Sequence, residues 1–222
     1  MLIVKCPSCG LESNRKTDHF SSAGMRREWS DGMWDYENPA NCRLSRCPHC
    51  RSIFWVNHAE RRKGASPTRF EILGFGDMRE VPNEEYEPHP QLLPARNEDL
   101  LDALKNELPM DDVHYLWREL WWRCNHPDRG TDIDFGQTIS EQLRESILRT
   151  VLAQEEAKPS DDRDIVIEAE LLRELGRFEE ALVRMEMAVC AGAPRALAIH
   201  AEAIAGNRRV CIAREDDSVV VY

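Results

Sequence analysis

The sequence contains no long apolar run and no recognisable targeting signal. None of its apolar segments approaches the roughly 20 residues that a membrane helix needs. The opening MLIVKC is too short to be the apolar core of a signal peptide. We therefore predict a cytoplasmic protein that does not associate with membranes.

Linear signatures of catalysis are also missing. GFGDM (74–78) has neither the glycine spacing nor the lysine of a phosphate-binding loop, and there is no nucleophile elbow and no His-Glu-x-x-His. The seven histidines are scattered, and acid-rich helices are ordinarily solvated faces. No catalytic constellation is visible, so the sequence predicts a protein that is not an enzyme.

Charged residues are abundant but unevenly distributed. The whole chain has a net charge of −11, whereas residues 1–70 hold 12 Lys and Arg against 7 Asp and Glu and are therefore net +5. A basic first part joined to an acidic body indicates two parts with separate roles.

Cysteine is concentrated at the start of the chain. Five of the eight cysteines lie in the first 50 residues, four of them in the motifs CPSCG and CPHC. In a reducing compartment, paired thiols of this kind favour metal binding over disulfides. Each Cys-x-x-Cys turn places two thiolates on one side of a metal, and two turns complete the tetrahedron that suits Zn2+. We predict that Cys6, Cys9, Cys47 and Cys50 bind a structural Zn2+.

The flanks of these motifs predict a zinc ribbon, because LIV precedes the first motif, SIFWV follows the second, and both are strand-like. A rubredoxin-type iron site and a redox-active disulfide remain alternatives for the same thiols. Cys42 and His49 are competing ligands, with His49 poorly placed inside the second motif. Cys124, Cys190 and Cys211 are expected to be small buried apolar residues.

The spacer between the two motifs is longer than the common pattern of about 15–20 residues. In GMRREWSDGMWDY (24–36), two tryptophans flank Ser30-Asp31-Gly32, which predicts a tight turn and a hairpin within the spacer. Basic residues with interleaved aromatics suit single-stranded nucleic acid. The residues that would form this basic ribbon surface are Arg26, Arg27, Arg43, Arg46, Arg51, Trp29, Trp34 and Trp55.

Residues 57–96 are mostly a connector. TRFEILGF (68–75) reads as a strand that completes the ribbon's sheet, and the proline-rich VPNEEYEPHPQLLP (81–94) reads as a linker. We predict an α+β protein with a small β zinc-ribbon domain at 1–80, a linker at 81–96 and a mostly α-helical domain at 97–222.

Three amphipathic helices are expected after the linker, at 97–108, 111–124 and 140–157. Asn97 is the expected N-cap of the first and Ser140 of the third. Their apolar faces are Leu100, Leu101, Leu104 and Leu108; Val113, Leu116, Trp117, Leu120, Trp121 and Cys124; and Leu143, Ile147 and Val151.

The most regular pattern is DIVIEAELLRELGRFEEALVRMEMAVCAGAP (164–194), in which two predicted helices flank Gly176-Arg177-Phe178. Gly176 can end the first helix in a left-handed cap. Small residues recur where the helices must touch, at Ala169, Ala181 and Ala188. Residues 163–191 thus resemble one tetratricopeptide repeat. The resemblance implies a helix pair that contributes to a protein-binding groove.

A second copy of the repeat is expected to begin after Pro194. The usual period of ~34 residues carries Ile165 to Ile199 and Ala169 to Ala203. A repeat of this kind needs neighbours to bury its faces, and the upstream helices are expected to supply them.

The tripeptide His126-Pro127-Asp128 is the one that J-domain co-chaperones use to stimulate a chaperone ATPase. Here the preceding segment Asp111–Arg123 has three acids and two bases, whereas a J-domain is basic at that place. The tripeptide also falls one residue late relative to the preceding Trp-Arg-x-Leu. We instead expect Asn125 to cap the helix end and Pro127 to stop the helix.

The paired knuckles, the WSDG turn, the ELWWRCNHPDR helix end and the ELLRELGRFEEAL repeat together are similar to uncharacterised bacterial proteins that pair a zinc ribbon with tetratricopeptide-like helices. This resemblance implies no activity. We predict a zinc-binding adaptor that binds an unknown protein partner through its helical repeat. The alternatives are a nucleic-acid-associated factor that uses the basic ribbon and, less favoured, a co-chaperone.

Overall fold

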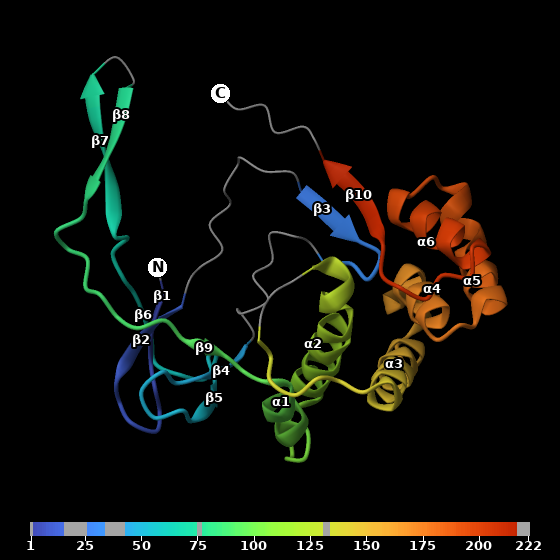
Figure 1. Ribbon diagram of the computed structural model, residues 1–222, viewed down its shortest axis with the longest axis horizontal. Helices are drawn as coiled ribbons and strands as arrows, with labels where there is room; N and C mark the ends of the chain where they lie inside the picture. The colour runs from blue at the N-terminus through green and yellow to red at the C-terminus, as the bar shows by residue number, and fades with distance from the viewer. Residues whose placement is uncertain (1, 16–25, 34–42, 75–76, 131–133, 217–222) are drawn as a thin grey trace. The chain divides into compact units, whose positions relative to one another are not determined.

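The computed structural model describes residues 2–15, 26–33, 43–74, 77–130 and 134–216 and shows an α+β fold (Figure 1). The chain divides into two compact units. The cysteine unit comprises Met1–His19 and Pro39–Ala95, and the helical unit comprises Phe20–Asn38 and Arg96–Tyr222. No helix in the described residues is both long enough and apolar enough to cross a lipid bilayer.

Antiparallel pairing organises the cysteine unit. Its strands are β1 (Leu2–Lys5), β2 (Glu12–Arg15), β4 (Leu44–Arg46), β5 (Ile53–Trp55), β6 (Arg61–Lys63), β7 (Thr68–Gly74), β8 (Asp77–Pro82) and β9 (Leu93–Pro94). Two three-stranded sheets have the orders β2-β1-β6 and β5-β4-β9, and β7 pairs with β8 as a separate hairpin (Figure 1). The hydrophobic core is small: Val4, Cys6, Cys47, Phe54, Val56 and Leu92.

The connector predicted at 57–96 contributes to this unit in ways that the sequence did not indicate. The strand predicted at 68–75 pairs with β8 rather than completing the sheet of the first knuckle, where β6 takes that place instead. Residues 81–95 are not a free linker. The backbone N–H groups of Asn14 and Leu92 bond to the carbonyls of Pro90 and Asn14, and Leu92 and Ala95 are buried.

The helical unit begins with three helices that follow the predicted apolar stripes. They are α1 (Asn97–Ala103), α2 (Met110–Arg129) and α3 (Glu141–Glu156). Leu116, Leu120 and Trp121 are fully buried on α2, and Ile147 and Val151 are buried on α3. The hydroxyl of Ser140 accepts the backbone N–H of Leu143 at 3.3 Å, which confirms that Ser140 is the N-cap of α3.

The first helix differs from its prediction at both ends. Its N-cap is Arg96 rather than Asn97. The side chain of Asn97 instead donates a hydrogen bond to the carbonyl of Gln137. The helix ends five residues earlier than predicted. The Asn106 amide donates to the carbonyls of Asp102 and Ala103, which closes the last turn.

The remaining helices are α4 (Ile165–Glu174), α5 (Phe178–Cys190) and α6 (Pro194–Ile204), preceded by a 3-10 turn, η1 (Ser160–Asp162). They pack in sequence, α4 on α5 and α5 on α6 (Figure 1). Their shared core holds Ala169, Met185, Ala196 and Ile199. As predicted, Gly176 follows α4 with a positive φ of 77°. The N–H groups of Gly176 and Arg177 bond back to Arg173 and Leu172, which is a Schellman motif.

The same motif recurs at the end of α6, where Gly206 and Asn207 bond back to Ala203 and Glu202. The two motifs therefore lie 30 positions apart, shorter than the predicted period of ~34. Ile165 is 43% exposed whereas Ile199 is fully buried, so the predicted equivalence of these two residues is wrong. An offset of 30 pairs Ala169 with Ile199, and both are buried.

The hairpin predicted within the spacer begins as expected, because the N–H of Trp29 bonds to the carbonyl of Met33 at 2.8 Å, and its continuation from Trp34 lies outside the described residues. Strand β3 (Arg26–Trp29) pairs antiparallel with β10 (Ile212–Asp216), near the end of the described chain. The tight turn itself is confirmed, because the N–H of Gly32 bonds to the carbonyl of Trp29 at 2.9 Å. Trp34, the second tryptophan of the predicted hairpin, lies outside the described residues. The helical unit resumes at Arg96, within one residue of the predicted start at 97. The compact units differ from the predicted domains in two segments, because Phe20–Asn38 belongs to the helical unit and 81–95 belongs to the cysteine unit.

Candidate functional site

The four predicted metal ligands come together in the cysteine unit. Their Sγ atoms all lie within 4.8 Å of one another, and Cys6 to Cys50 and Cys9 to Cys47 are each 3.7 Å apart. A tetrahedron with Zn–S bonds of about 2.3 Å has edges of about 3.8 Å. The spacing of the thiols therefore fits a tetrahedral metal ion.

Two matching knuckles create this spacing. The first connects β1 to β2, with the N–H of Gly10 bonded to the carbonyl of Cys6 at 2.9 Å. The second connects β4 to β5, with the N–H of Arg51 bonded to the carbonyl of Cys47 at 3.0 Å. Gly10 and Arg51 occupy equivalent positions and have positive φ angles of 74° and 64°. Arg51 adopts this conformation despite its Cβ because the knuckle requires it.

Burial divides the cluster into inner and outer thiols. Cys6 and Cys47 belong to the hydrophobic core, whereas Cys9 and Cys50 are exposed. The inner pair joins the metal site to the packing of both sheets. A metal held here would connect the two knuckles, which belong to different sheets of the unit.

The pKa values of the two exposed thiols, Cys9 and Cys50, are shifted in opposite directions. Hydrogen bonds from Ser52, with smaller contributions from Cys9 and Cys47, lower the pKa of Cys50 to about 6 against the opposing effect of desolvation. The backbone N–H of Leu11 lowers the pKa of Cys9, but desolvation and the neighbouring thiols outweigh it and raise that pKa to about 12. Four thiolates this close repel one another, and a divalent cation removes that repulsion. The donor set therefore favours a thiolate-binding metal.

Of the other candidate ligands, the structure describes His49, which does not join the cluster. His49 is exposed, and its Nε2 lies 3.3 Å from the carbonyl oxygen of Glu12. Cys42 lies outside the described residues. Cys124 and Cys211 are half-buried, but Cys190 is exposed, so the expectation of burial is wrong for Cys190. Burial raises the pKa of the Cys124 thiol to about 12.

The basic and aromatic residues predicted for a nucleic-acid surface do not belong to one unit. Arg26, Arg27 and Trp29 lie on β3 in the helical unit, and Trp29 is buried. Arg43 and Arg51 are exposed in the cysteine unit. The predicted basic and aromatic residues are therefore divided between the two units.

A second set of residues, which sequence reasoning missed, is buried in the helical unit. Asp31 is 1% exposed, and its carboxylate accepts hydrogen bonds from the Asn125 amide at 2.9 Å and from the Arg129 guanidinium. The backbone N–H of Met33 donates to the same carboxylate at 3.2 Å. The turn predicted from its Ser-Asp-Gly sequence is thus fixed by an ion pair to the last turn of α2.

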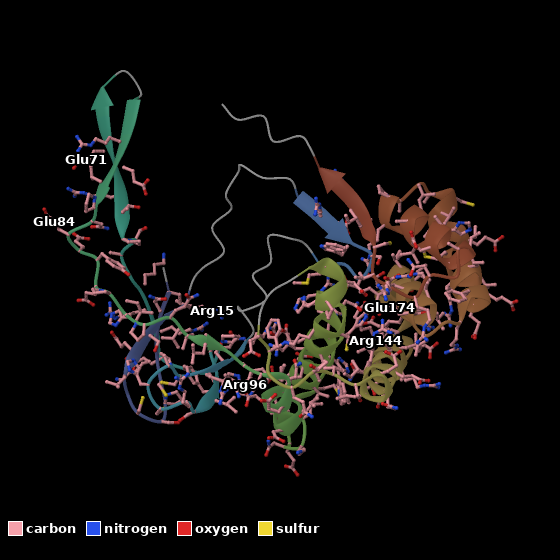
Figure 2. The ribbon with its side chains drawn as sticks, in the orientation of Figure 1. Arg15, Glu71, Glu84, Arg96, Arg144 and Glu174 are labelled. Atoms are coloured by element: carbon pink, nitrogen blue, oxygen red, sulfur yellow. The ribbon has the colours of Figure 1, made fainter. Side chains whose placement is uncertain are left out.

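Glu174 on α4 is the second buried acid of this set (Figure 2). It accepts hydrogen bonds from Arg144 at 2.7 Å, from the Trp121 indole at 3.0 Å and from Asn125 at 3.0 Å. Burial and the neighbouring Glu170 raise the pKa of Glu174 to about 7, against the opposing effect of Arg144. Asn125 therefore bridges two carboxylates, those of Asp31 and Glu174.

A third buried acid, Glu170, completes the set. It pairs with Arg173 through two hydrogen bonds of 2.8 and 2.7 Å and accepts the hydroxyl of Ser30. We call Ser30, Asp31, Asn125, Arg129, Arg144, Glu170, Arg173 and Glu174 the buried polar cluster. Each carboxylate in it has an arginine partner, and this pairing offsets part of the desolvation cost.

The tripeptide His126-Pro127-Asp128 lies inside α2, which continues to Arg129 and ends at Gly130. The prediction that Asn125 caps the helix and Pro127 stops it is wrong, because the buried Asn125 is held by two carboxylates instead. His126 is 4% exposed and stacks on Phe135 at a centroid distance of 5.1 Å. A buried histidine is poorly placed to contact a chaperone, so the geometry does not favour the co-chaperone hypothesis.

The pKa of His126 has a testable consequence. Desolvation and the nearby Arg123 lower it from 6.5 to about 4. The unfolded chain therefore binds this proton more tightly, so the stability contributed by the neutral imidazole is present above pH 6.5 and is lost as the pH falls toward 4. This loss is about 2 kcal/mol at pH 5. Urea unfolding at pH 7 and pH 5 should show that His126→Gln loses less stability on acidification than the wild type, by that amount.

The variant comparison isolates His126 from Glu174, which acts in the opposite direction. The raised pKa of Glu174 gives stability that is lost as the pH rises from 4.5 to 7, and this contribution is the same in both proteins. Parallel pH profiles for wild type and His126→Gln would contradict the burial of a neutral imidazole.

Comparison with protein-family models, with curated proteins and with solved structures found no significant match to this chain.

Proposed function

We propose that the protein is a zinc-ribbon adaptor whose helical unit binds another protein. Zinc in the cysteine cluster is supported by the 3.7 Å edges between thiols and by two equivalent knuckles, each between antiparallel strands. A set of four thiolates in tetrahedral spacing with no open position suits a structural metal. In this role the metal replaces the large core that the cysteine unit lacks.

The tetratricopeptide-like part of the proposal rests on α4, α5 and α6. These helices pack consecutively, and identical Schellman motifs end the first and third. Such arrays bury their faces by stacking, so the terminal helix of a soluble array needs a polar outer face.

The observation that carries the interaction proposal is an apolar stripe on α6. Leu197, Ala201 and Ile204 follow one another at helical spacing and are all exposed, with Leu197 at 46% and Ile204 at 67%. The opposite side of the same helix is buried through Ala196, Ile199 and Ala203. The last helix of the array therefore presents the apolar face that a further helix would cover, and we assign that place to a partner protein's helix.

Affinity purification from the cells that make the protein tests this function. A tagged wild-type chain should retain a defined protein partner, identified by mass spectrometry, and Leu197→Glu/Ile204→Glu should lose it. The physical reason is that two carboxylates on the stripe cannot be desolvated without a large cost. Met110→Glu is the matched control, because Met110 is also apolar and 66% exposed but lies at the start of α2.

Retention of the same partner by the α6 double variant would contradict the adaptor proposal. Bound material that nuclease removes would instead support the nucleic-acid alternative, which also predicts strong weakening by salt. In that case Arg43→Glu and Arg51→Glu, which alter exposed residues of the cysteine unit, should release it.

A further inference from the structure

The helical unit contains a pocket of about 180 Å³ next to the buried polar cluster. It lies between the C-terminal half of α2, the segment 134–139 and the beginning of α3. Its lining residues are Asn97, Arg123, Cys124, His126, Pro127, Phe135, Gly136, Gln137, Thr138, Ile139 and Arg144. Among the described residues, no carboxylate lines the pocket, although acids outnumber bases in the chain, 40 to 29.

One wall of the pocket is held by hydrogen bonds to the start of α1. The backbone N–H of Asn97 donates to the carbonyl of Phe135 at 2.8 Å. The side-chain amide of Asn97 donates to the carbonyl of Gln137 at 3.0 Å. The N–H of Gln137 donates to the Glu98 carboxylate at 3.2 Å. This wall is therefore fixed in place rather than formed by an unattached loop.

Two guanidinium groups make the pocket cationic. The side chain of Arg144 is 15% exposed and reaches the pocket from α3. The guanidinium of Arg123 is fully buried, belongs to a residue that lines the pocket, and lies 4.3 Å from the centre of the Phe135 ring. Their acidic partners, Glu174 and Glu119, do not line the pocket. The positive ends of both ion pairs thus face the pocket, and the negative ends lie behind them.

His126 adds a neutral donor. Its Nδ1 lies 3.1 Å from the Nη1 of Arg129, which is always a donor, so Nδ1 must accept. The proton of the neutral imidazole therefore belongs to Nε2, on the other side of the ring. The exposed hydroxyl of Thr138 is a further donor at the rim.

We propose that this pocket binds a small oxyanion, the carboxylate or phosphate group of a small molecule. Arg144 and the Nε2–H of His126 donate to the oxyanion, Thr138 donates from the rim, and Arg123 supplies a fixed charge. The volume corresponds to about six water molecules at roughly 30 Å³ each, which suits a small anion. This site is separate from the α6 stripe and does not depend on the adaptor function.

Titration of the full chain with inorganic phosphate and with malonate tests the proposal. Ionic strength is held constant with sodium chloride, and the imidazole resonances of His126, assigned by their absence in His126→Gln, are followed by NMR. Saturable shifts with at least one of the anions are expected. Thr138→Glu places a like charge at the rim, whereas the neutral variant Thr138→Gln, which has nearly the same shape as Thr138→Glu, loses only the rim hydroxyl. Binding by Thr138→Glu should therefore be at least about tenfold weaker than binding by Thr138→Gln.

Two results would overturn the proposal. One is the absence of saturation with both anions. The other is an equal affinity of Thr138→Glu and Thr138→Gln for the anion, because binding elsewhere on the chain would not depend on the charge at the pocket rim. Gln137→Glu, itself isosteric and exposed, repeats the charge test should Thr138→Glu fail to fold. Preference for phosphate over malonate, or the reverse, identifies which oxyanion the pocket accepts.

Discussion

Replacing Cys47 with serine is expected to abolish stoichiometric metal binding and to unfold the cysteine unit while the helical unit keeps its secondary structure. Cys47 is fully buried, and its sulfur is both a proposed ligand and a member of the small core of the unit. Apparent binding free energies of structural zinc reach about 10–16 kcal/mol in zinc-finger peptides, so the loss of one thiolate removes a large share of the stability of such a unit.

Elemental analysis by mass spectrometry measures this result directly. The wild-type chain should carry one zinc, and the variant should carry much less than one. Circular dichroism should show preserved helix, and limited proteolysis should cut the variant within residues 43–95. The control is Cys190→Ser, which removes an exposed thiol outside the cluster and should change neither readout. Full zinc content in Cys47→Ser would contradict the tetrahedral site, and iron in place of zinc would support the rubredoxin-type alternative.

Replacing Asp31 with alanine is expected to destabilise the helical unit by about 3–5 kcal/mol, because it leaves the Arg129 guanidinium buried without its carboxylate. The side chains of this pair are 0% and 3% exposed, so water does not replace the missing partner. Domains of this kind are stable by only about 5–15 kcal/mol, which makes the loss a large fraction of the total. Urea unfolding followed by the helical signal measures it.

A double-mutant cycle separates the ion pair from other effects of the substitution. Asp31→Ala/Arg129→Met removes both charges and should be more stable than Asp31→Ala alone. Glu145→Ala is the surface control, since the pair of Glu145 with Arg149 is about half exposed and its loss should cost less than about 1 kcal/mol. Additive effects in the cycle would show that Asp31 and Arg129 do not interact in solution.

The candidate metal site was predictable because the residues that define it lie in two short stretches of sequence. Two Cys-x-x-Cys turns carry the ligand identity, the spacing and the strand flanks in two short segments. The helix faces were predictable for a similar reason, since Leu116, Leu120 and Ile147 are buried where a period of 3.6 residues places them. The Schellman motif at Gly176 follows from a single glycine after an amphipathic run.

The buried polar cluster was not predictable because its contacts span the chain. Ser30 and Glu170 are 140 residues apart, and Asp31 and Arg129 are 98 apart. Charged residues spaced three or four apart in a helix ordinarily predict a solvated face. In α4, however, Glu170, Arg173 and Glu174 are fully buried. The pairing of β3 with β10 joins segments far apart in the sequence in the same way, so the spacer alone could not predict it. A residual signal lay in WSDG, where Ser30-Asp31-Gly32 predicted the turn but not the residues that pair with Asp31.

The interleaving of the two units sets an order of events during synthesis. Cys9 and Cys47 are only 38 residues apart. Ser30 can form its hydrogen bond only after Glu170, 140 residues further on, has been synthesised. At about 5–20 residues per second, the two knuckles are synthesised within seconds of each other, but Glu170 follows Ser30 only after roughly 7–28 s. Metal binding in the nascent chain would close the loop that carries β3 before α4 exists. The metal would then shorten the search by which β3 finds the helical unit, because closing a loop removes conformational entropy from the chain.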